Sequence, residues 1–246
     1  MIKNNIYTFQ CENNTSSNLK TKIILNKTEF LDIRVPYSWY NINTFNNTFT
    51  LTDSSDNDYV ITLIQGQYLT GTLISAQIQT QMNACASTDV YAVSYDTMTC
   101  KYTVSESGGP DDFEITWNDN YILRNMLGFS VDLSAAATYT STGIASSRFC
   151  EEIFIKIDEF QYQSKNKCKS LLTQINENYY NYHGYVSNVD FGNHVEIKFN
   201  YTGYIPDIND IQRGERIDHL TISVYNEYGL LIPLNHKKIL IRFKNL

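Results

Sequence analysis

Several features that mark common classes of protein are scarce in this sequence. Among 246 residues there are four prolines and five cysteines, and no long apolar run. An odd number of widely spaced cysteines without a CxxC pair excludes a disulfide framework and a zinc site, so we expect reduced thiols. Nowhere are there roughly 18 consecutive apolar residues, which argues against a membrane span. The cysteines are Cys11, Cys85, Cys100, Cys150 and Cys168.

Charge is also scarce, since 18% of the residues are charged and the net charge is −7. An acidic chain does not wrap nucleic acid over its general surface, so we expect no nucleic-acid partner. The exception is a basic run at residues 236–238 with Arg242 and Lys244. Alternation with apolar residues favours a solvated strand face over a genome contact.

No pattern of residues indicates catalysis or a bound cofactor. The four histidines have no metal-ligand spacing, and no GxSxG motif is present. The run Asp53–Asp58 has the side chains of a calcium loop but lacks its glycine and final glutamate, so we interpret it as a turn. We therefore expect no enzyme, no metal, no cofactor and no small-molecule substrate.

What the sequence does contain is alternation of apolar and polar residues. Leu31, Ile33 and Val35 alternate with charged residues up to Pro36, and alternation resumes at residues 48–52. Proline ends a strand because it has no N–H to donate. We interpret Ile23–Leu51 as strand, proline-ended corner, strand, forming one corner of a β-sandwich.

The same period recurs along the chain and is interrupted by a few helical stretches. Helical spacing predicts a helix at about 70–84 with Thr70 as its cap, and a short helix at Tyr121–Leu127 stopped by Gly128. A third short helix is expected at Cys168–Glu177. Ten to twelve short strands with two or three short helices indicate a mainly β, antiparallel β-sandwich with Greek-key or jelly-roll connections.

Four segments carry a resemblance to a known family. They are VPYSWYNI followed by NNTFTL (residues 35–51), a Gly66–Thr70 step into LISAQIQTQMN, the segment Asn125–Phe129, and the closing segment IDHLTISVYNEYGLLIPLNHKKILIRF (217–243). In this order they resemble the minor capsid and penton-type jelly-roll proteins of large eukaryotic DNA viruses (giant viruses) and virophages. The resemblance covers roughly residues 20–246.

The resemblance implies jelly-roll topology and a structural role in the virion. It implies a minor capsid or penton component that is synthesised in the host cytoplasm and assembles into the icosahedral capsid through subunit contacts. Its partners would be capsid proteins, including the major capsid protein, and copies of itself. A penton-type protein would form a pentamer, and a cyclic homo-oligomer of this kind closes without leaving open interfaces.

Residues 1–20 have too few apolar residues to bury much by themselves, so we expect a flexible N-terminal arm. Residues 21–246 would form the sandwich, either as one body or as two lobes, about 21–130 and 149–246, joined by the small, polar stretch 131–148. The arm and a tyrosine-rich loop are the expected subunit contacts. The predicted interface residues are Ile2, Tyr7, Phe9, Tyr179, Tyr180, Tyr182 and Tyr185.

Two other functions fit a β-sandwich. Aromatic side chains at residues 37–40 and 179–185 are suited to stacking on sugar rings, so a lectin-like carbohydrate-binding module is the main alternative. For Trp39 we favour packing in the core. A hydrolase would need a histidine bonded to both a Ser or Cys and a carboxylate, an arrangement that no sequence motif predicts.

Overall fold

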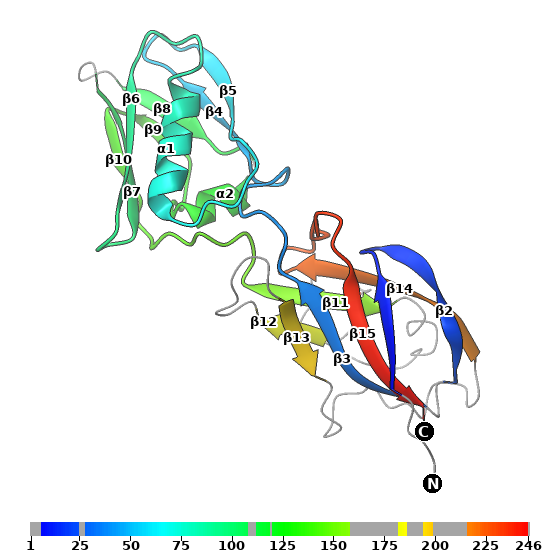
Figure 1. Ribbon diagram of the computed structural model, residues 1–246. Helices are drawn as coiled ribbons and strands as arrows, with labels where there is room; N and C mark the ends of the chain where they lie inside the picture. The colour runs from blue at the N-terminus through cyan, green and yellow to red at the C-terminus, as the bar shows by residue number, and fades with distance from the viewer. Residues whose placement is uncertain are drawn as a thin grey trace, which may run out of the picture. The chain divides into compact units, whose positions relative to one another are not determined.

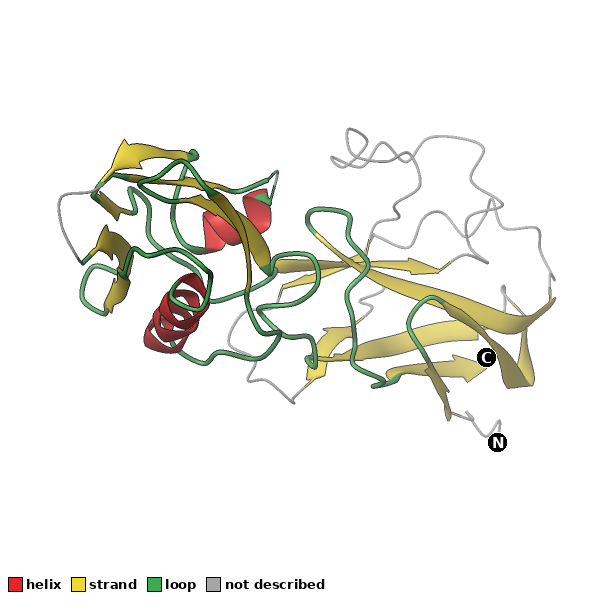
Figure 2. Cartoon of the chain, turned by 90° about the horizontal axis from the view of Figure 1, so that it is seen from above, coloured by secondary structure: helices red, strands yellow, loops and turns green. Residues whose placement is uncertain are grey.

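The computed structural model describes residues 6–24, 28–107, 112–118, 120–157, 182–185, 194–198 and 216–245. The chain divides into two compact units (Figure 1). One comprises Met1–Trp39 and Cys150–Leu246 and is called the jelly-roll unit below. The other, Tyr40–Phe149, is called the inserted unit because it interrupts the first in sequence. Both described helices belong to the inserted unit (Figure 2).

The described strands of the jelly-roll unit form two four-stranded antiparallel sheets. One sheet has the order β1-β15-β3-β13 and the other β12-β11-β14-β2. The strands are β1 (Ile6–Cys11), β2 (Thr15–Ile24), β3 (Thr28–Pro36), β11 (Glu152–Ile157), β12 (Tyr182–Tyr185), β13 (His194–Lys198), β14 (Arg216–Asn226) and β15 (Ile239–Asn245).

The pairing of these strands is that of a long hairpin rolled into two sheets. In chain order the first strand pairs with the eighth, the second with the seventh, the third with the sixth and the fourth with the fifth, all antiparallel. Rolling the hairpin adds the contacts β15–β3 and β14–β11. Eight strands in two interlocked Greek keys define a jelly roll. The predicted mainly β, antiparallel jelly-roll fold is therefore confirmed.

Alternating apolar residues of this unit face its core. On β3 Ile33 and Val35 are fully buried, and on β15 Ile239 and Ile241 are too. The second sheet contributes its own fully buried apolar side chains from β11 and β14. These are Ile153, Ile155, Leu220, Ile222 and Val224. Because strand side chains alternate between faces, this period-two pattern is the one that buries one face of each sheet.

In the sequence, the inserted unit comes between β3 and β11, the third and fourth strands of the jelly roll. It contains a four-stranded sheet of order β5-β4-β8-β9 and a three-stranded sheet of order β10-β7-β6. Its elements are β4 (Thr48–Thr52), β5 (Asp58–Thr62), α1 (Gly71–Met82), β6 (Tyr91–Asp96), β7 (Lys101–Glu106), β8 (Phe113–Thr116), α2 (Tyr121–Met126), β9 (Leu133–Ala136) and β10 (Thr138–Thr140).

Helix α1 forms where the sequence predicts it. The Thr70 side chain accepts a hydrogen bond from the backbone N–H of Leu73, which satisfies one of the free donors of the first turn. Ile74, Ile78 and Met82 form the buried stripe. Gly71 is buried against the ring of Tyr95, where a Cβ atom would lie 2.6 Å from ring atoms.

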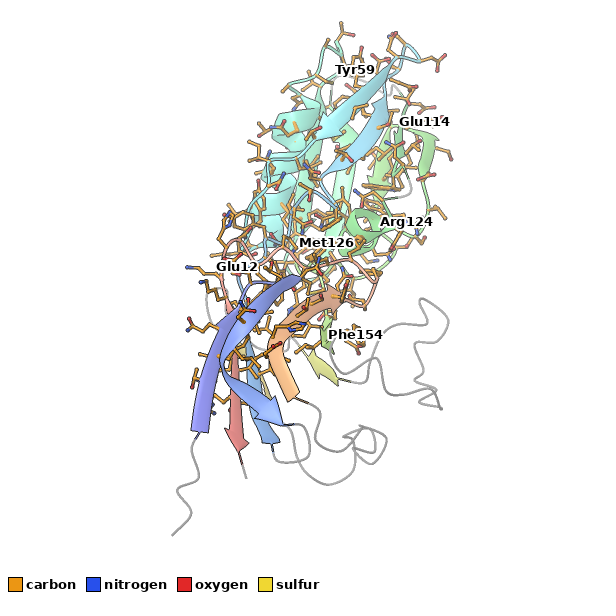
Figure 3. The ribbon with its side chains drawn as sticks, turned by 90° about the vertical axis from the view of Figure 1, so that its right-hand side faces the viewer. Glu12, Tyr59, Glu114, Arg124, Met126 and Phe154 are labelled. Carbon is orange, nitrogen blue, oxygen red and sulfur yellow. The ribbon has the colours of Figure 1, made fainter. Side chains whose placement is uncertain are left out.

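Helix α2, which carries Arg124 and Met126 (Figure 3), is also close to its predicted position. Asn120 caps it by accepting a hydrogen bond from the backbone N–H of Leu123 at 3.2 Å. The helix ends before Gly128, which has a φ of 77°. That left-handed conformation suits glycine because it has no Cβ atom, and it stops the helix as the sequence indicates.

The predicted domain boundaries differ from the structure in three places. Residues 6–11 and 15–24, expected in a flexible arm and at its end, are strands β1 and β2. The stretch 131–148, expected to join two lobes, contains β9 and β10 within the inserted unit. The corner expected in Ile23–Leu51 is the crossing from one unit to the other after Trp39. For β1 and β2 the cause is that their partner strands, β15 and β14, lie about 200 or more residues away in sequence and leave no local pattern.

Candidate functional site

Ionisable side chains do not converge on a metal site in the part of the chain that the structure describes. No group of three or more His, Cys, Asp or Glu side chains there could hold a metal ion. Likewise, none of the described helices is both long and apolar enough to pass through a membrane. His219 contacts the carboxylate of its neighbour Asp218 at 2.8 Å, and both side chains are at least half exposed. That pair lacks the buried setting in which a carboxylate orients a catalytic imidazole.

The run Asp53–Asp58 is a turn, as predicted, built around one carboxylate. The buried Asp53 carboxylate accepts hydrogen bonds from the backbone N–H groups of Ser55 and Asn57, both at 2.9 Å, and from the Tyr59 hydroxyl at 3.0 Å. Burial pushes its pKa up, but these hydrogen bonds outweigh burial and hold the pKa below its ordinary value. The carboxylate therefore stabilises the turn between β4 and β5, and Tyr59 lies on β5 (Figure 3).

The basic run near the C-terminus differs in part from the predicted solvated face. Lys237 and Lys238 are exposed, whereas Arg242 on β15 forms an ion pair with Asp32 on β3. The register of the two strands places these residues opposite each other. Arg242 therefore serves the jelly-roll sheet, while the two lysines remain on the surface.

Charge is divided unevenly between the two units. The inserted unit contains eleven Asp and Glu but three Lys and Arg, a net charge of −8, whereas the rest of the chain is at +1. From Tyr40 to Cys100 there are five Asp and no Lys, Arg or Glu. The sequence contains this signal, but it becomes visible only when the bounds of the inserted unit are known.

Exposed apolar side chains are also concentrated in the inserted unit. Every large apolar side chain found exposed among the described residues belongs to it. They are Phe45, Val60, Ile64, Leu69, Leu73, Val90, Met98, Tyr121, Val131 and Ile144.

One edge of the three-stranded sheet, strand β6, is protected by side chains of the neighbouring helix. The Asn83 side-chain amide donates to the Tyr91 carbonyl and accepts from the Tyr91 N–H, both at 2.8 Å. Gln79 accepts from the Val93 N–H at 2.9 Å. These amides take the place of a neighbouring strand at Tyr91 and Val93, so this stretch of the β6 edge is covered.

The corresponding edge of the four-stranded sheet, strand β5, has no such cover among the described residues. Val60 is 73% exposed and Ile64 is 61% exposed, while Ile61 and Leu63 between them are buried. β5 contains no Lys or Pro, the residues that commonly prevent an edge strand from pairing with another chain. The edge of β5 is therefore open where the edge of β6 is covered.

The residues predicted as subunit contacts do not form one described cluster. Tyr7 and Phe9 lie on β1, which pairs with β15, and Phe9 is half-buried. Tyr182 and Tyr185 lie at the two ends of β12, an edge strand. Ile2, Tyr179 and Tyr180, as well as the expected helix at 168–177, fall outside the described residues. Their role in contacts stays a prediction.

Trp39 is packed as expected. It is 1% exposed, and its ring lies 4.5 Å from that of Tyr37, centroid to centroid. These two members of the aromatic stretch 37–40 therefore belong to the core of the jelly-roll unit and offer no open face to a sugar ring.

Comparison with known proteins gives matches among solved structures alone. No protein-family model matches the sequence, and no curated protein is similar to it. A crystal structure of the mavirus penton protein is similar over 98% of each chain, with 11% identity and a TM-score of 0.47. A chain in a cryo-EM structure of the Sputnik virophage is similar over 98% of this chain and 97% of its own, with 9% identity and a TM-score of 0.36.

Proposed function

We propose that this protein is a structural component of an icosahedral virus capsid, of the minor capsid or penton type, and that it performs no chemistry. The observation that carries the proposal is the rolled-hairpin topology of the jelly-roll unit, in which all four hairpin pairs are present. Eight-stranded jelly rolls are the scaffold of viral capsid domains, of lectins and of cupins.

The positions of the four family-like segments support the capsid assignment among these three. The first runs from the end of β3 into β4, the second forms α1, the third ends α2, and the fourth forms β14 and the start of β15. They are therefore spread over both units and do not mark one pocket. A protein whose function is assembly depends on its whole shape, and family-like segments in both units fit that role.

A cupin role has no support, because a cupin needs a cluster of metal ligands and the described strands do not provide one. The lectin-like module is the second candidate because jelly rolls also occur in lectin domains. Its aromatic residues would come from the tyrosines at 179–185, since Tyr37 and Trp39 are buried.

In the proposed mechanism the protein acts by shape. The jelly-roll unit would pack against copies of itself, and a heterologous contact repeated around an axis closes into a ring. We assign the contacts to β1 with Tyr7 and Phe9 and to the tyrosines around β12, with a pentamer as the expected ring. The major capsid protein would be the outer partner of that ring.

Native mass spectrometry of the full chain tests this proposal. We expect a discrete cyclic oligomer, a pentamer for a vertex protein, that persists across protein concentration and salt. Replacing both Tyr182 and Tyr185 by serine should shift the distribution toward monomer, whereas Tyr139→Phe, in the inserted unit, serves as a matched control. An oligomer unaffected by the tyrosine changes would contradict the assigned contacts.

A monomer at all concentrations, together with saturable binding to one glycan on an array, would replace the capsid proposal with the lectin-like module. A monomer that binds no glycan but co-sediments with assembled capsids would leave a cementing minor capsid protein. The two results separate a protein that forms its own ring from one that adds to a shell built by others.

A further inference from the structure

The backbone of β5 has hydrogen-bonding groups that point away from its sheet. The Leu63 N–H donates to the Asn47 carbonyl at 2.7 Å, and the Asp53 N–H donates to the Asn57 carbonyl at 3.0 Å. In an antiparallel ladder every second residue bonds to the neighbouring strand, so residues 57, 59, 61 and 63 bond toward β4. The N–H and C=O groups of Val60 and Thr62 therefore face the open edge, where no described residue bonds to them.

The side chains of the same residues lie on the exposed face of the sheet. Val60 and Thr62 are exposed, and Val60 lies opposite Thr50 of β4. β-Branched residues at these positions favour an extended neighbour, because their side chains pack well across a pair of strands. At the far end the Ile64 carbonyl is occupied by the Tyr68 hydroxyl at 2.8 Å. That contact limits the open stretch to the strand itself.

The surroundings of this edge determine what kind of chain fits it. Asp58 is the first residue of β5 and Asp56 lies in the turn before it, and both are exposed. No Lys or Arg occurs anywhere in residues 40–100, which include β4, α1 and β6. An acidic edge attracts a basic segment and repels an acidic one. It also disfavours pairing of β5 with β5 of a second copy, since each inserted unit has a net charge of −8.

We propose that β5 is a docking edge for an extended, basic segment of a partner protein, which adds to the β5-β4-β8-β9 sheet as a fifth strand. Backbone hydrogen bonds to Val60 and Thr62 would provide the affinity, and the nearby aspartates would select positive charge. The contrast within the inserted unit is informative, because side-chain amides of Asn83 and Gln79 cover part of the edge of β6, whereas no side chain among the described residues bonds to the outward groups of β5. The inference does not depend on the capsid function.

Hydrogen exchange with two synthetic peptides tests this proposal on the full chain. One peptide of about ten residues alternates lysine and valine, and its counterpart alternates glutamate and valine. In the free protein the amides of Val60 and Thr62 should exchange rapidly, whereas that of Ile61, already paired with Phe49, should exchange slowly. The lysine peptide should slow amide exchange at Val60 and Thr62 by about tenfold or more and leave the exchange rate of Ile61 unchanged. The glutamate peptide should leave all three exchange rates unchanged.

Two variants separate the backbone from the charge. Thr62→Pro removes an outward N–H that the sheet does not use, a place where an edge strand tolerates proline, and should weaken binding about tenfold. Val60→Lys leaves the backbone intact. It should weaken binding of the lysine peptide and allow the glutamate peptide to bind. Val131→Lys, at another exposed valine of the inserted unit, is the charge-matched control and should leave the binding of both peptides unchanged. If Thr62→Pro fails to fold, the test is whether peptide binding changes in Val60→Lys and stays the same in Val131→Lys.

The proposal is overturned if neither peptide slows the Val60 and Thr62 amides, or if both do so equally. Undiminished binding by folded Thr62→Pro would also overturn it, because pairing through the backbone would then be absent. Slowing that depends on protein concentration without any peptide would identify a second copy as the occupant and would exclude the basic partner.

Discussion

Arg242 of β15 and Asp32 of β3 lie opposite each other and form an ion pair within one sheet of the jelly-roll unit. The Arg242 Nε atom donates to both Asp32 oxygens, at 2.9 and 2.7 Å, and Asp32 is 2% exposed. A carboxylate at this depth is costly unless it is paired, and Arg242 is the nearer of two arginines that pair with Asp32, since Arg34 Nε lies 3.9 Å from Asp32 Oδ1. The arginine also fixes the pairing between the last strand and the third.

Replacing Arg242 by methionine should destabilise the jelly-roll unit by about 2 kcal/mol, because the buried Asp32 carboxylate would keep only the longer ion pair with Arg34, whose Nε atom lies 3.9 Å from Asp32 Oδ1. The measurement is urea unfolding followed by the fluorescence of Trp39 in a Trp117→Phe background. Lys238→Met, an exposed change in the same basic run, should fall within about 0.5 kcal/mol of the parent. Equal effects of the two changes would show that the ion pair contributes no stability.

Two glycines of the inserted unit provide a matched pair for backbone strain. Gly128 has a φ of 77°, and a Cβ atom there would lie 2.5 Å from the Gly143 carbonyl oxygen. Gly128→Ala should therefore cost more than about 1–2 kcal/mol, the usual penalty of a left-handed residue. At Gly66 the nearest atom to a Cβ would be 3.5 Å away, so Gly66→Ala should be nearly neutral. Trp117 fluorescence during urea unfolding measures both, and similar losses would contradict the strain at Gly128.

Glu227 should make the stability of the jelly-roll unit depend on pH. Burial raises the pKa of its carboxyl, and the charge of Glu151 adds to this, although the Glu151 N–H donates to the Glu227 Oε1 atom at 3.1 Å. The folded state therefore holds its proton more tightly than the unfolded state does. Its contribution to stability is fully present below the ordinary pKa of 4.5 and is lost as the pH rises through the folded pKa.

The free energy of unfolding, measured between pH 4 and pH 8 for the parent and for Glu227→Gln, isolates this effect. The difference between the two should change with pH above about 4.5, with the parent losing stability relative to the variant as the pH rises. Glu12→Gln, in the exposed turn after β1 (Figure 3), is the control for removing one surface carboxylate from the same unit. A flat difference for Glu227→Gln would contradict the raised pKa.

Asp53 should have the opposite effect in the inserted unit. Although burial works against it, hydrogen bonds from Asn57, Ser55 and Tyr59 hold its pKa below the ordinary value of 3.8. Its contribution to stability is present above that value and is lost as the pH falls through the folded pKa. In acid unfolding followed by Trp117 fluorescence, the stability of Asp53→Asn should therefore fall less steeply with decreasing pH than that of the parent. Asp56→Asn, at an exposed position of the same turn, should behave like the parent.

Local patterns were sufficient for many of the individual elements, although not for β1, β9 and β10. The alternation around Ile33 and Val35 predicted β3, and helical spacing with Thr70 as a cap predicted α1, because burial of one face and satisfaction of helix ends depend on nearby residues. The turn at Asp53–Asp58 and the helix stop at Gly128 were predicted for the same reason. Among candidate sites, the absence of catalytic motifs was read from the sequence, but the open edge of β5 was missed.

The sequence by itself determined a mainly β chain with few charges and the positions of most described strands and both described helices. Only the tertiary structure decided which strands pair, that residues 6–11 join the sheet through β15 more than 220 residues away, and that Tyr40–Phe149 form a separate unit. It also decided which edges are covered, since the Asn83 amide reaches β6 while Val60 on β5 stays open. The physical reason is that a strand cannot satisfy its own backbone hydrogen bonds. Alternation of apolar and polar residues specifies which face of the strand is buried, but the strands that pair with its backbone can lie anywhere in the chain.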